Sequence, residues 1–330
     1  MSDDNDQNDA SRRDFIKKAG MVAASGVAMA TVPGVAHATA NQAEKSIVAN
    51  MKTKPLNGRS VLITGAARGI GLAMALKMAE DGANIALLDI AAPNAMQGIV
   101  NYALSSKEDL DMAVSLVKAK GVKAVPLIAD VRSRSQMNDA VKQAVKALGR
   151  LDIVVANAGI SNGDGFEKET DRIFQEIMNV NVTGVANTAH AAIPYLKQNK
   201  KGGRIIAISS VAGRRGVSQL TSYSASKWAV IGLVKSLALD LGEHNITVNA
   251  IAPTAVQTVM WRGADNGEMI NKIKNSAMDM LVRNYHALPT GSIHPDEIAN
   301  AAAFLASDNA KYVSGITLDV NAGWSGQMTG

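Results

Sequence analysis

Short apolar segments alternate with longer amphipathic segments from about residue 60 to the end of the chain. Short apolar runs are typical of strands buried on both faces, and apolar positions that recur every three or four residues are typical of helices. This alternation predicts one α/β domain built on a doubly wound parallel sheet, with ligands at the carboxyl ends of the strands. The predicted strands are 61–64, 84–89, 125–129, 151–155, 204–208, 246–252 and 316–320, and the predicted helices are about 72–80, 110–120, 135–148, 168–199, 223–237 and 295–307.

A glycine-rich turn separates the first predicted strand from the first predicted helix. Glycine lets the backbone approach a pyrophosphate, and a helix N-terminus supplies N–H groups and partial positive charge. Asp89 ends the second strand, where a carboxylate would bind the adenosine ribose and repel a 2′-phosphate, so the sequence favours NAD. Arg68 leaves NADP open as an alternative. The residues of the turn are Gly65, Ala66, Ala67, Arg68, Gly69, Ile70 and Gly71.

Two later strands also end in residues suited to a dinucleotide. Asp130 and Val131 follow the third strand and are expected to meet the adenine. Asn157 and Gly159 follow the fourth strand, where glycine would let the backbone lie against the nicotinamide ribose. The carboxyl ends of parallel strands meet at one edge of the sheet, so these residues predict a single extended cofactor site.

A candidate proton-transfer group lies in the stretch from Ser210 to Lys227. Tyr223 and Lys227 are four residues apart on a predicted helix, so they share a face. A free phenol has a pKa of about 10, and a neighbouring cation favours the phenolate. Ser210, at the end of a strand, can hydrogen-bond the same substrate oxygen. A lone Tyr-x-x-x-Lys is usually a solvated pair, so this prediction depends on the nucleotide site beside it.

The first 38 residues have the layout of an export signal. A basic segment with Arg12 and Arg13 precedes a weakly apolar stretch, and Ala36-His37-Ala38 follows as a small-x-small cleavage pattern. The paired arginines before Phe15 resemble a twin-arginine signal, which predicts a periplasmic protein. The apolar stretch is too weak for a stable membrane span. A disordered tail, leaving the protein cytoplasmic, is the alternative, and residues 39–57 are predicted to be a linker.

Composition and charge argue against some classes of function, nucleic-acid binding first among them. The chain has 34 Lys and Arg against 29 Asp and Glu, a net charge of +5, and these charges are scattered. Aromatic residues make up only 4%, so nucleic-acid binding is not expected. There is no cysteine, and the chain therefore needs no disulfide in an oxidising compartment. No metal site is predicted.

Across residues 58–325 the chain resembles the short-chain dehydrogenase/reductase family, which has a Rossmann-type fold. The resemblance implies that Tyr223 is the acid/base and that Lys227 lowers its pKa and holds the nicotinamide ribose. It also implies that Ser210 orients the substrate oxygen and that Asn181 holds a proton-relay water. Two positions depart from the family pattern: Ala156 stands where the family usually has Asn, and Thr254 stands where it usually has Gly. The residues that carry the resemblance or its implied cofactor contacts are Thr64, Gly65, Gly69, Ile70, Gly71, Asp130, Val131, Asn157, Ala158, Gly159, Asn181, Ser210, Tyr223, Lys227, Pro253, Val256 and Thr258.

A narrower resemblance is to carveol-dehydrogenase-like enzymes associated with mycofactocin. It is carried by Pro253-Thr254, by an insertion at 91–108 and by the run 284–289, Asn-Tyr-His-Ala-Leu-Pro. This resemblance implies NAD held almost irreversibly and reoxidised by an external redox acceptor. The segment 255–290, rich in methionine, is expected to form a substrate loop or the core side of amphipathic helices. Its apolar members are Met260, Trp261, Met269, Met278, Met280 and Leu281.

The predicted function is hydride transfer between NAD and a secondary alcohol or ketone that is apolar or cyclic. Two alternatives remain open at this stage, an NADPH-dependent ketoreductase with exchangeable cofactor and a non-catalytic nucleotide-binding protein. The family resemblance also implies a homo-oligomer, commonly a tetramer.

Overall fold

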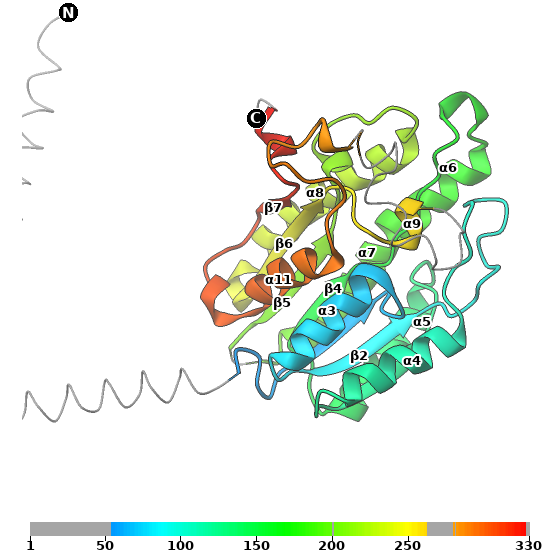
Figure 1. Ribbon diagram of the computed structural model, residues 1–330. Helices are drawn as coiled ribbons and strands as arrows, with labels where there is room; N and C mark the ends of the chain where they lie inside the picture. The colour runs from blue at the N-terminus through cyan, green and yellow to red at the C-terminus, as the bar shows by residue number, and fades with distance from the viewer. Residues whose placement is uncertain (1–53, 200, 263–279, 281, 328–330) are drawn as a thin grey trace, which may run out of the picture. The chain divides into compact units, whose positions relative to one another are not determined.

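The computed structural model describes residues 54–199, 201–262, 280 and 282–327, which lie in one compact unit, Lys54–Gly330. A seven-stranded parallel sheet forms its centre, in the order β3-β2-β1-β4-β5-β6-β7 (Figure 1). The predicted doubly wound parallel sheet is confirmed. The strands are β1 Ser60–Thr64, β2 Asn84–Asp89, β3 Ala124–Ile128, β4 Ile153–Ala156, β5 Gly203–Ile208, β6 Ile246–Pro253 and β7 Thr317–Val320.

Helices cover both faces of the sheet and create two separate apolar cores. The first core lies beneath α5, α6, α7 and α8, and the second beneath α3, α4 and α11. Within β1, Leu62 points into the first core while Val61 and Ile63 point into the second, as the alternation of a strand requires. The α-helices are α3 Gly69–Glu80, α4 Lys107–Lys118, α5 Arg134–Leu148, α6 Asp171–Met178, α7 Gly184–Leu196, α8 Thr221–Leu241, α9 Val259–Arg262 and α11 Pro295–Ala306.

The strand order reverses between β1 and β4, which are neighbours in the sheet although two strands separate them in sequence. In a doubly wound sheet this switch point opens a crevice at the carboxyl ends of the strands, where ligands bind. The glycine-rich turn follows β1 at this point, and Asn157 follows β4 beside it. The fold therefore brings the candidate cofactor residues to one edge of the sheet.

Two boundaries differ from those predicted. The single predicted helix 168–199 is interrupted by a π-helical turn, η2 Asn179–Thr183, which separates α6 from α7. Such a turn has no signature in hydrophobic spacing, because both flanking helices keep their periodicity. The folded unit begins at Lys54 rather than residue 58, since the Leu56 side chain is fully buried and its N–H donates to the carbonyl of Asp81.

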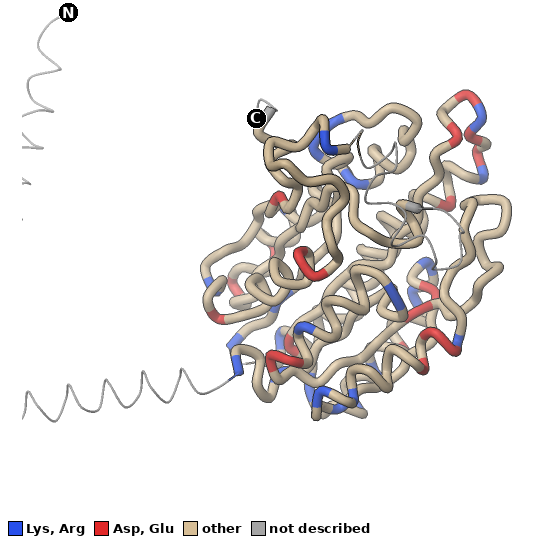
Figure 2. The backbone as a smooth tube through the Cα atoms, viewed as in Figure 1, with Lys and Arg blue, Asp and Glu red and all other residues tan. Residues whose placement is uncertain are grey.

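Basic and acidic positions are interspersed over the described part of the chain (Figure 2). Among the described residues, no helix is long and apolar enough to cross a bilayer. The predicted signal and most of the predicted linker lie outside the described residues, as do Met269, Met278 and Leu281.

Candidate functional site

The glycine-rich turn brings two stretches of backbone into close approach. A Cβ atom added to Gly71 would lie 2.1 Å from the carbonyl oxygen of Gly65, so only glycine fits there. Gly65 and Gly69 have φ values of 65° and 59°, in the left-handed region. Arg68 is the N-cap of α3 but makes no capping hydrogen bond, and the first turn of α3 has no acidic residue. The first N–H groups of α3 can therefore bind an anion, as a pyrophosphate requires.

Asp89 is buried at the end of β2, and its carboxylate holds the adjacent turns. Its Oδ2 accepts from the N–H of Ala67 at 3.1 Å. Its Oδ1 accepts from the N–H of Ala91 at 3.2 Å and from the hydroxyl of Ser105 at 2.5 Å. An ionised carboxylate offers about four acceptor positions, so these three bonds leave capacity for a ribose hydroxyl. Asp89 thus stabilises the turn and still suits an adenosine ribose.

Residues 99–105, which we call the strap, connect the Asp89 end of the site to the segment that follows β4. The Arg68 guanidinium donates to the carbonyl oxygen of Ala103 at 2.5 Å. Together with the bond from Ser105 to Asp89, this contact ties the strap to the phosphate turn and to the end of β2. Arg68 is therefore engaged by the strap rather than directed freely toward a 2′-phosphate.

The other end of the strap contacts the segment that follows β4. The Tyr102 hydroxyl accepts from the N–H of Ser161 at 3.2 Å, and the Asn162 side chain donates to the carbonyl of Ile99 at 2.8 Å. Burial raises the pKa of Tyr102 to about 12, against the lowering effect of the Ser161 N–H. Tyr102 also interacts electrostatically with Tyr223. The strap thus runs from the phosphate turn to the neighbourhood of the candidate catalytic tyrosine.

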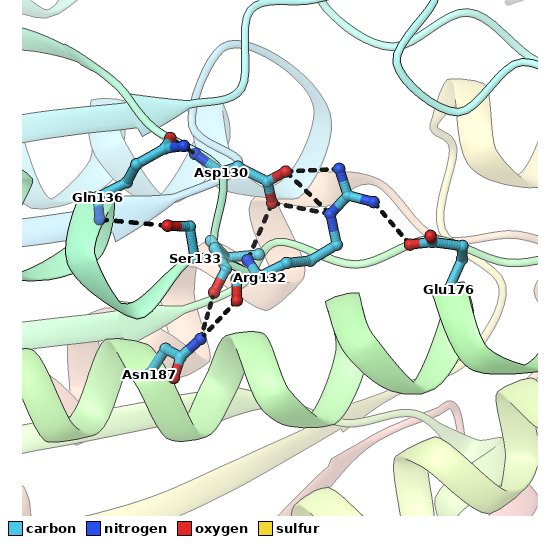
Figure 3. Close-up of polar contacts among 7 residues, drawn as sticks. Asp130, Arg132, Ser133, Gln136, Glu176 and Asn187 are labelled. Atoms are coloured by element: carbon cyan, nitrogen blue, oxygen red, sulfur yellow. Dashed lines mark hydrogen bonds and ion pairs between the residues drawn. The ribbon is translucent and has the colours of Figure 1, made fainter.

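Asp130, after β3, belongs to an ion-pair network (Figure 3). The Arg132 guanidinium donates to both carboxylate oxygens of Asp130 and, at 2.6 Å, to Glu176 on α6. Hydrogen bonds to Asp130, and then to Glu176, raise the pKa of Arg132. The Asn187 side chain holds the carbonyls of Val131 and Arg132, so α6 and α7 fix this loop. The loop at the predicted adenine position is therefore held by hydrogen bonds from α6 and α7, but the Asp130 carboxylate is already paired with Arg132.

The segment after β4 is held by Thr64, the last residue of β1. Its hydroxyl accepts from the N–H groups of both Asn157 and Ala158 at 3.0 Å. The Asn157 side chain returns a bond to the carbonyl of Thr64 at 2.8 Å. A Cβ atom on Gly159 would lie 3.2 Å from Asn181 Oδ1, so this backbone passes directly over the π-helical turn.

Ser210, Tyr223 and Lys227 converge at the carboxyl end of β5. Ser210 follows β5 and caps a short 3-10 turn, η3 Val211–Gly213, by accepting from the N–H of Ala212 at 3.1 Å. Tyr223 lies in the first turn of α8 and hydrogen-bonds Ser210. The Lys227 ammonium donates to the carbonyl of Ile208 at 2.9 Å and lies 5.4 Å from the centre of the Tyr223 ring. The predicted set is therefore assembled in one place.

Burial dominates the ionisation of this set. It raises the pKa of Tyr223, and the hydrogen bond with Ser210 opposes that rise. Burial also lowers the pKa of Lys227 to about 8, because the dehydrated ammonium has no carboxylate beside it in the described part of the chain. Lys227 was predicted to lower the pKa of Tyr223. In the chain alone the pKa of Tyr223 is raised instead, because the burial that brings the two side chains together disfavours both the phenolate and the ammonium.

Asn181 lies fully buried in the π-helical turn η2. Its side-chain oxygen accepts from the N–H of Ile160 at 2.8 Å, and its amide donates to the Ile160 carbonyl at 2.9 Å and the Ser226 hydroxyl at 3.0 Å. π-helical turns recur at functional sites because they redirect one side chain out of the helical register. Here the turn aims Asn181 at the segment after β4 and at α8, one residue before Lys227.

The end of β6 completes the site on the far side of the turn. Val256 pairs with Ile293 in an isolated bridge, and Thr258 lies close to Gly69, where an added Cβ would be 3.3 Å from the threonine methyl group. Pro253 ends the strand. Met260 is 36% exposed and Met280 is 57% exposed, so neither belongs to the packed core.

Sequence reasoning missed several groups that shape the site. These are the hydroxyls of Tyr102 and Ser105, the Arg132 pair, and the hydrogen bond between His286 and Thr254. The length of the insertion at 91–108 signalled additional structure near Asp89, but its contact with Ser161 joins positions far apart in sequence and has no local pattern.

Comparison with known proteins agrees with this geometry. The family model for short chain dehydrogenases matches residues 59–268 of this chain. (-)-trans-Carveol dehydrogenase of Rhodococcus erythropolis is 37% identical over 81% of this chain and 98% of its own. The carveol dehydrogenase of Mycobacterium avium in complex with NAD superposes with a TM-score of 0.76 at 36% identity, covering 82% of this chain and 98% of that one. An NAD-bound short chain dehydrogenase of Mycobacterium paratuberculosis gives 0.74 at 37% identity, covering 82% and 99%.

The predicted family resemblance is thus confirmed by matches that span nearly the whole folded unit. The similarity to carveol dehydrogenases, predicted from the end of β6, the insertion and residues 284–289, is found both in sequence and in structure. The chain belongs to the short-chain dehydrogenase family of oxidoreductases.

Proposed function

We propose that this protein transfers a hydride between NAD and a secondary alcohol or its ketone, with Tyr223 as the acid/base. The observation that carries the proposal is the convergence of Ser210, Tyr223 and Lys227 at the crevice where α3 presents its uncapped N-terminus. A proton-transfer group and an anion site at one strand edge are what a nicotinamide dehydrogenase needs.

The chain is an NAD-dependent enzyme, and its residues fit that cofactor. Gly65, Gly69 and Gly71 with the start of α3 would hold the pyrophosphate, and Asp89 would hold the adenosine ribose. A buried carboxylate at that position repels a 2′-phosphate, while Arg68 is occupied by the strap. NAD supplies the hydride acceptor for alcohol oxidation.

The side chains of the site account for the proton. In ketone reduction the Tyr223 phenol, kept neutral by burial, donates its proton to the developing alkoxide oxygen, and Ser210 donates a hydrogen bond to the same oxygen. In alcohol oxidation the phenolate takes the hydroxyl proton as the C–H bond breaks. Lys227 supplies positive charge to stabilise that phenolate, and Asn181 holds the segment against which the nicotinamide ribose would lie.

The substrate is an apolar or cyclic alcohol, and the cofactor is held tightly. The carveol dehydrogenases similar to this chain support the first statement. The strap supports the second, because its contacts with Arg68, Asp89 and Ser161 cross from one end of the cofactor crevice to the other. A ligand beneath such a segment leaves only when those bonds open, which slows dissociation.

A tightly held cofactor is consistent with export by the twin-arginine route and with a periplasmic location. NAD carried across the membrane would need an external redox acceptor, and mycofactocin-linked chemistry would supply one. These proposals, like the homo-tetrameric state, rest on the sequence pattern of residues 1–38 and on family resemblance.

The test is alcohol oxidation by the Tyr223→Phe variant. The substitution keeps the ring and removes only the proton-transferring oxygen, so activity should fall by about 10²–10⁴-fold while NAD binding is retained. Tyr312→Phe is the matched control, because that side chain is 89% exposed. Turnover of Tyr223→Phe close to wild type would contradict the mechanism. Preference for NADPH would favour the exchangeable ketoreductase, and no turnover of any alcohol by the wild type would favour a non-catalytic protein.

A further inference from the structure

The end of β6 carries a buried hydroxyl where the family pattern has glycine. Thr254 Oγ1 lies 2.7 Å from His286 Nε2, and the second ring nitrogen, Nδ1, lies 2.8 Å from the carbonyl oxygen of Thr290. A carbonyl oxygen can only accept, so Nδ1 carries the proton. In the neutral ring Nε2 is then the acceptor, and the Thr254 hydroxyl donates to it. Thr254 and His286 are 7% and 8% exposed, so water does not compete freely for either group.

Aromatic packing fixes the His286 ring on its other side. Trp324 meets it edge to face, with the ring centres 5.7 Å apart, and Trp324 stacks on Tyr285 at 4.9 Å. The Arg215 guanidinium lies over both of these rings, at 5.7 Å from Tyr285 and 5.6 Å from Trp324. His286 is therefore held by two hydrogen bonds and an aromatic contact, and it presents Nε2 to Thr254 in one orientation.

The stretch 254–258 connects this histidine to the phosphate turn. Its middle is held by backbone bonds, from Gln257 N–H to the Ile293 carbonyl and from Ile293 N–H to the Ala255 carbonyl, both at 2.9 Å. Its far end, Thr258, packs beside Gly69. At the near end the Thr254 N–H donates to the Val320 carbonyl at 3.2 Å, and the Thr254 side chain adds the contact that ties this end to His286. A glycine at 254 would leave that end freer and His286 Nε2 unpaired.

We propose that Thr254 and His286 form a matched pair of positioning residues that sets the stretch 254–258 against the cofactor beside the phosphate turn. This inference rests on the proposed function, because it assumes that NAD occupies the crevice. The pair explains why threonine replaces glycine after Pro253: the hydroxyl is useful only where a histidine from the 284–289 run reaches it.

Thr254→Val tests the pair, because valine keeps the shape of threonine and lacks its hydroxyl. Thr254→Ser is the matched control, because serine keeps the hydroxyl. The measurements are the dissociation constant of NAD, the KM for NAD, kcat at saturating NAD, and the melting temperature. Losing one buried hydrogen bond should weaken NAD binding by about tenfold in Thr254→Val, with kcat less affected than KM. Thr254→Ser should bind NAD as the wild type does. A purely structural role would lower the melting temperature and leave NAD affinity unchanged.

A second variant keeps the test open if Thr254→Val does not fold. Thr254→Val with His286→Phe replaces both partners by apolar groups, so neither side chain leaves a polar atom of the other unpaired; the Thr290 carbonyl loses its bond from Nδ1, and the ring contact with Trp324 is kept. NAD affinity of this double variant should still be about tenfold below wild type, since the link is absent. Nitrogen NMR of ¹⁵N-histidine-labelled protein at alkaline pH should show the Nδ1–H tautomer for the signal missing in the double variant.

Three outcomes would overturn the inference: wild-type NAD affinity in the hydroxyl-free variants, an equal loss of affinity in Thr254→Ser, or an Nε2–H tautomer for His286. Failure of the wild type itself to bind NAD is a different result, because it would refute the proposed function from which the inference starts.

Discussion

Replacing Lys227 by methionine should stabilise the nucleotide-free protein at neutral pH while abolishing activity. The side chain keeps its length, and the buried ammonium is removed. Burial lowers the pKa of Lys227 from 10.5 to about 8, so the folded state holds the charge less readily than the unfolded state does. By linkage this costs about 3 kcal/mol of folding free energy at pH 7.

The cost depends on pH with a definite sign. Between pH 8 and 10.5 the unfolded chain binds more protons at this position than the folded chain, so the cost of Lys227 to wild-type stability falls as the pH rises. At pH 9.5 the remaining cost is about 1 kcal/mol, and the advantage of Lys227→Met should shrink by about 2 kcal/mol from pH 7 to pH 9.5. The variant also loses the bond to the Ile208 carbonyl, which offsets part of its gain, so the change in the stability difference with pH is more informative than its value at one pH.

Urea unfolding of both proteins at several pH values measures this slope. Lys235→Met is the matched control, because Lys235 is exposed on the same helix. A stability difference between wild type and Lys227→Met that stays constant from pH 7 to 9.5 would refute the argument that Lys227 is held in a dehydrated site.

Three further predictions concern the cofactor and the N-terminus. Asp89→Ala should relax the preference for NAD over NADP, measured as the ratio of their dissociation constants; an unchanged ratio would assign specificity elsewhere, first to Arg68. Tyr102→Phe removes the acceptor of the Ser161 N–H and should speed NAD release about five-fold or more, measured by chase with unlabelled NAD, whereas an unchanged rate would mean that the strap does not hold the cofactor. Replacing Arg12 and Arg13 by lysine should abolish export, and wild-type protein from the periplasm should contain NAD; wild-type protein found in the cytoplasm, or empty in the periplasm, would reject the export proposal.

Much of the fold could be predicted because its determinants are local. Buried strands such as β1 are short apolar runs, and α5 ends one residue before Gly149, which has a φ of 85°. The relation of Tyr223 to Lys227 follows from helical spacing alone. These features depend on residues close together in the chain, where hydrophobic period and turn chemistry are informative.

The remaining features depend on contacts between distant residues. Thr254 meets His286 across 32 positions, and Tyr102 meets Ser161 across 59. Neither partner signals the other, because a threonine and a tyrosine are compatible with many environments. The lowered pKa of Lys227 could not be predicted from the sequence either, because it depends on how completely α8 and β5 exclude water around Nζ.

Hydride transfer itself provides the most direct measurement of the central claim. The wild-type protein with NAD should be mixed with a cyclic secondary alcohol carrying deuterium at the carbinol carbon, and the nicotinamide product analysed by mass spectrometry after one turnover. The account predicts that one deuterium is transferred to the nicotinamide ring by the wild type, with the rate reduced by about 10²–10⁴-fold in Tyr223→Phe. Absence of deuterium from the nicotinamide, or equal rates of deuterium transfer by the wild type and Tyr223→Phe, would contradict this mechanism.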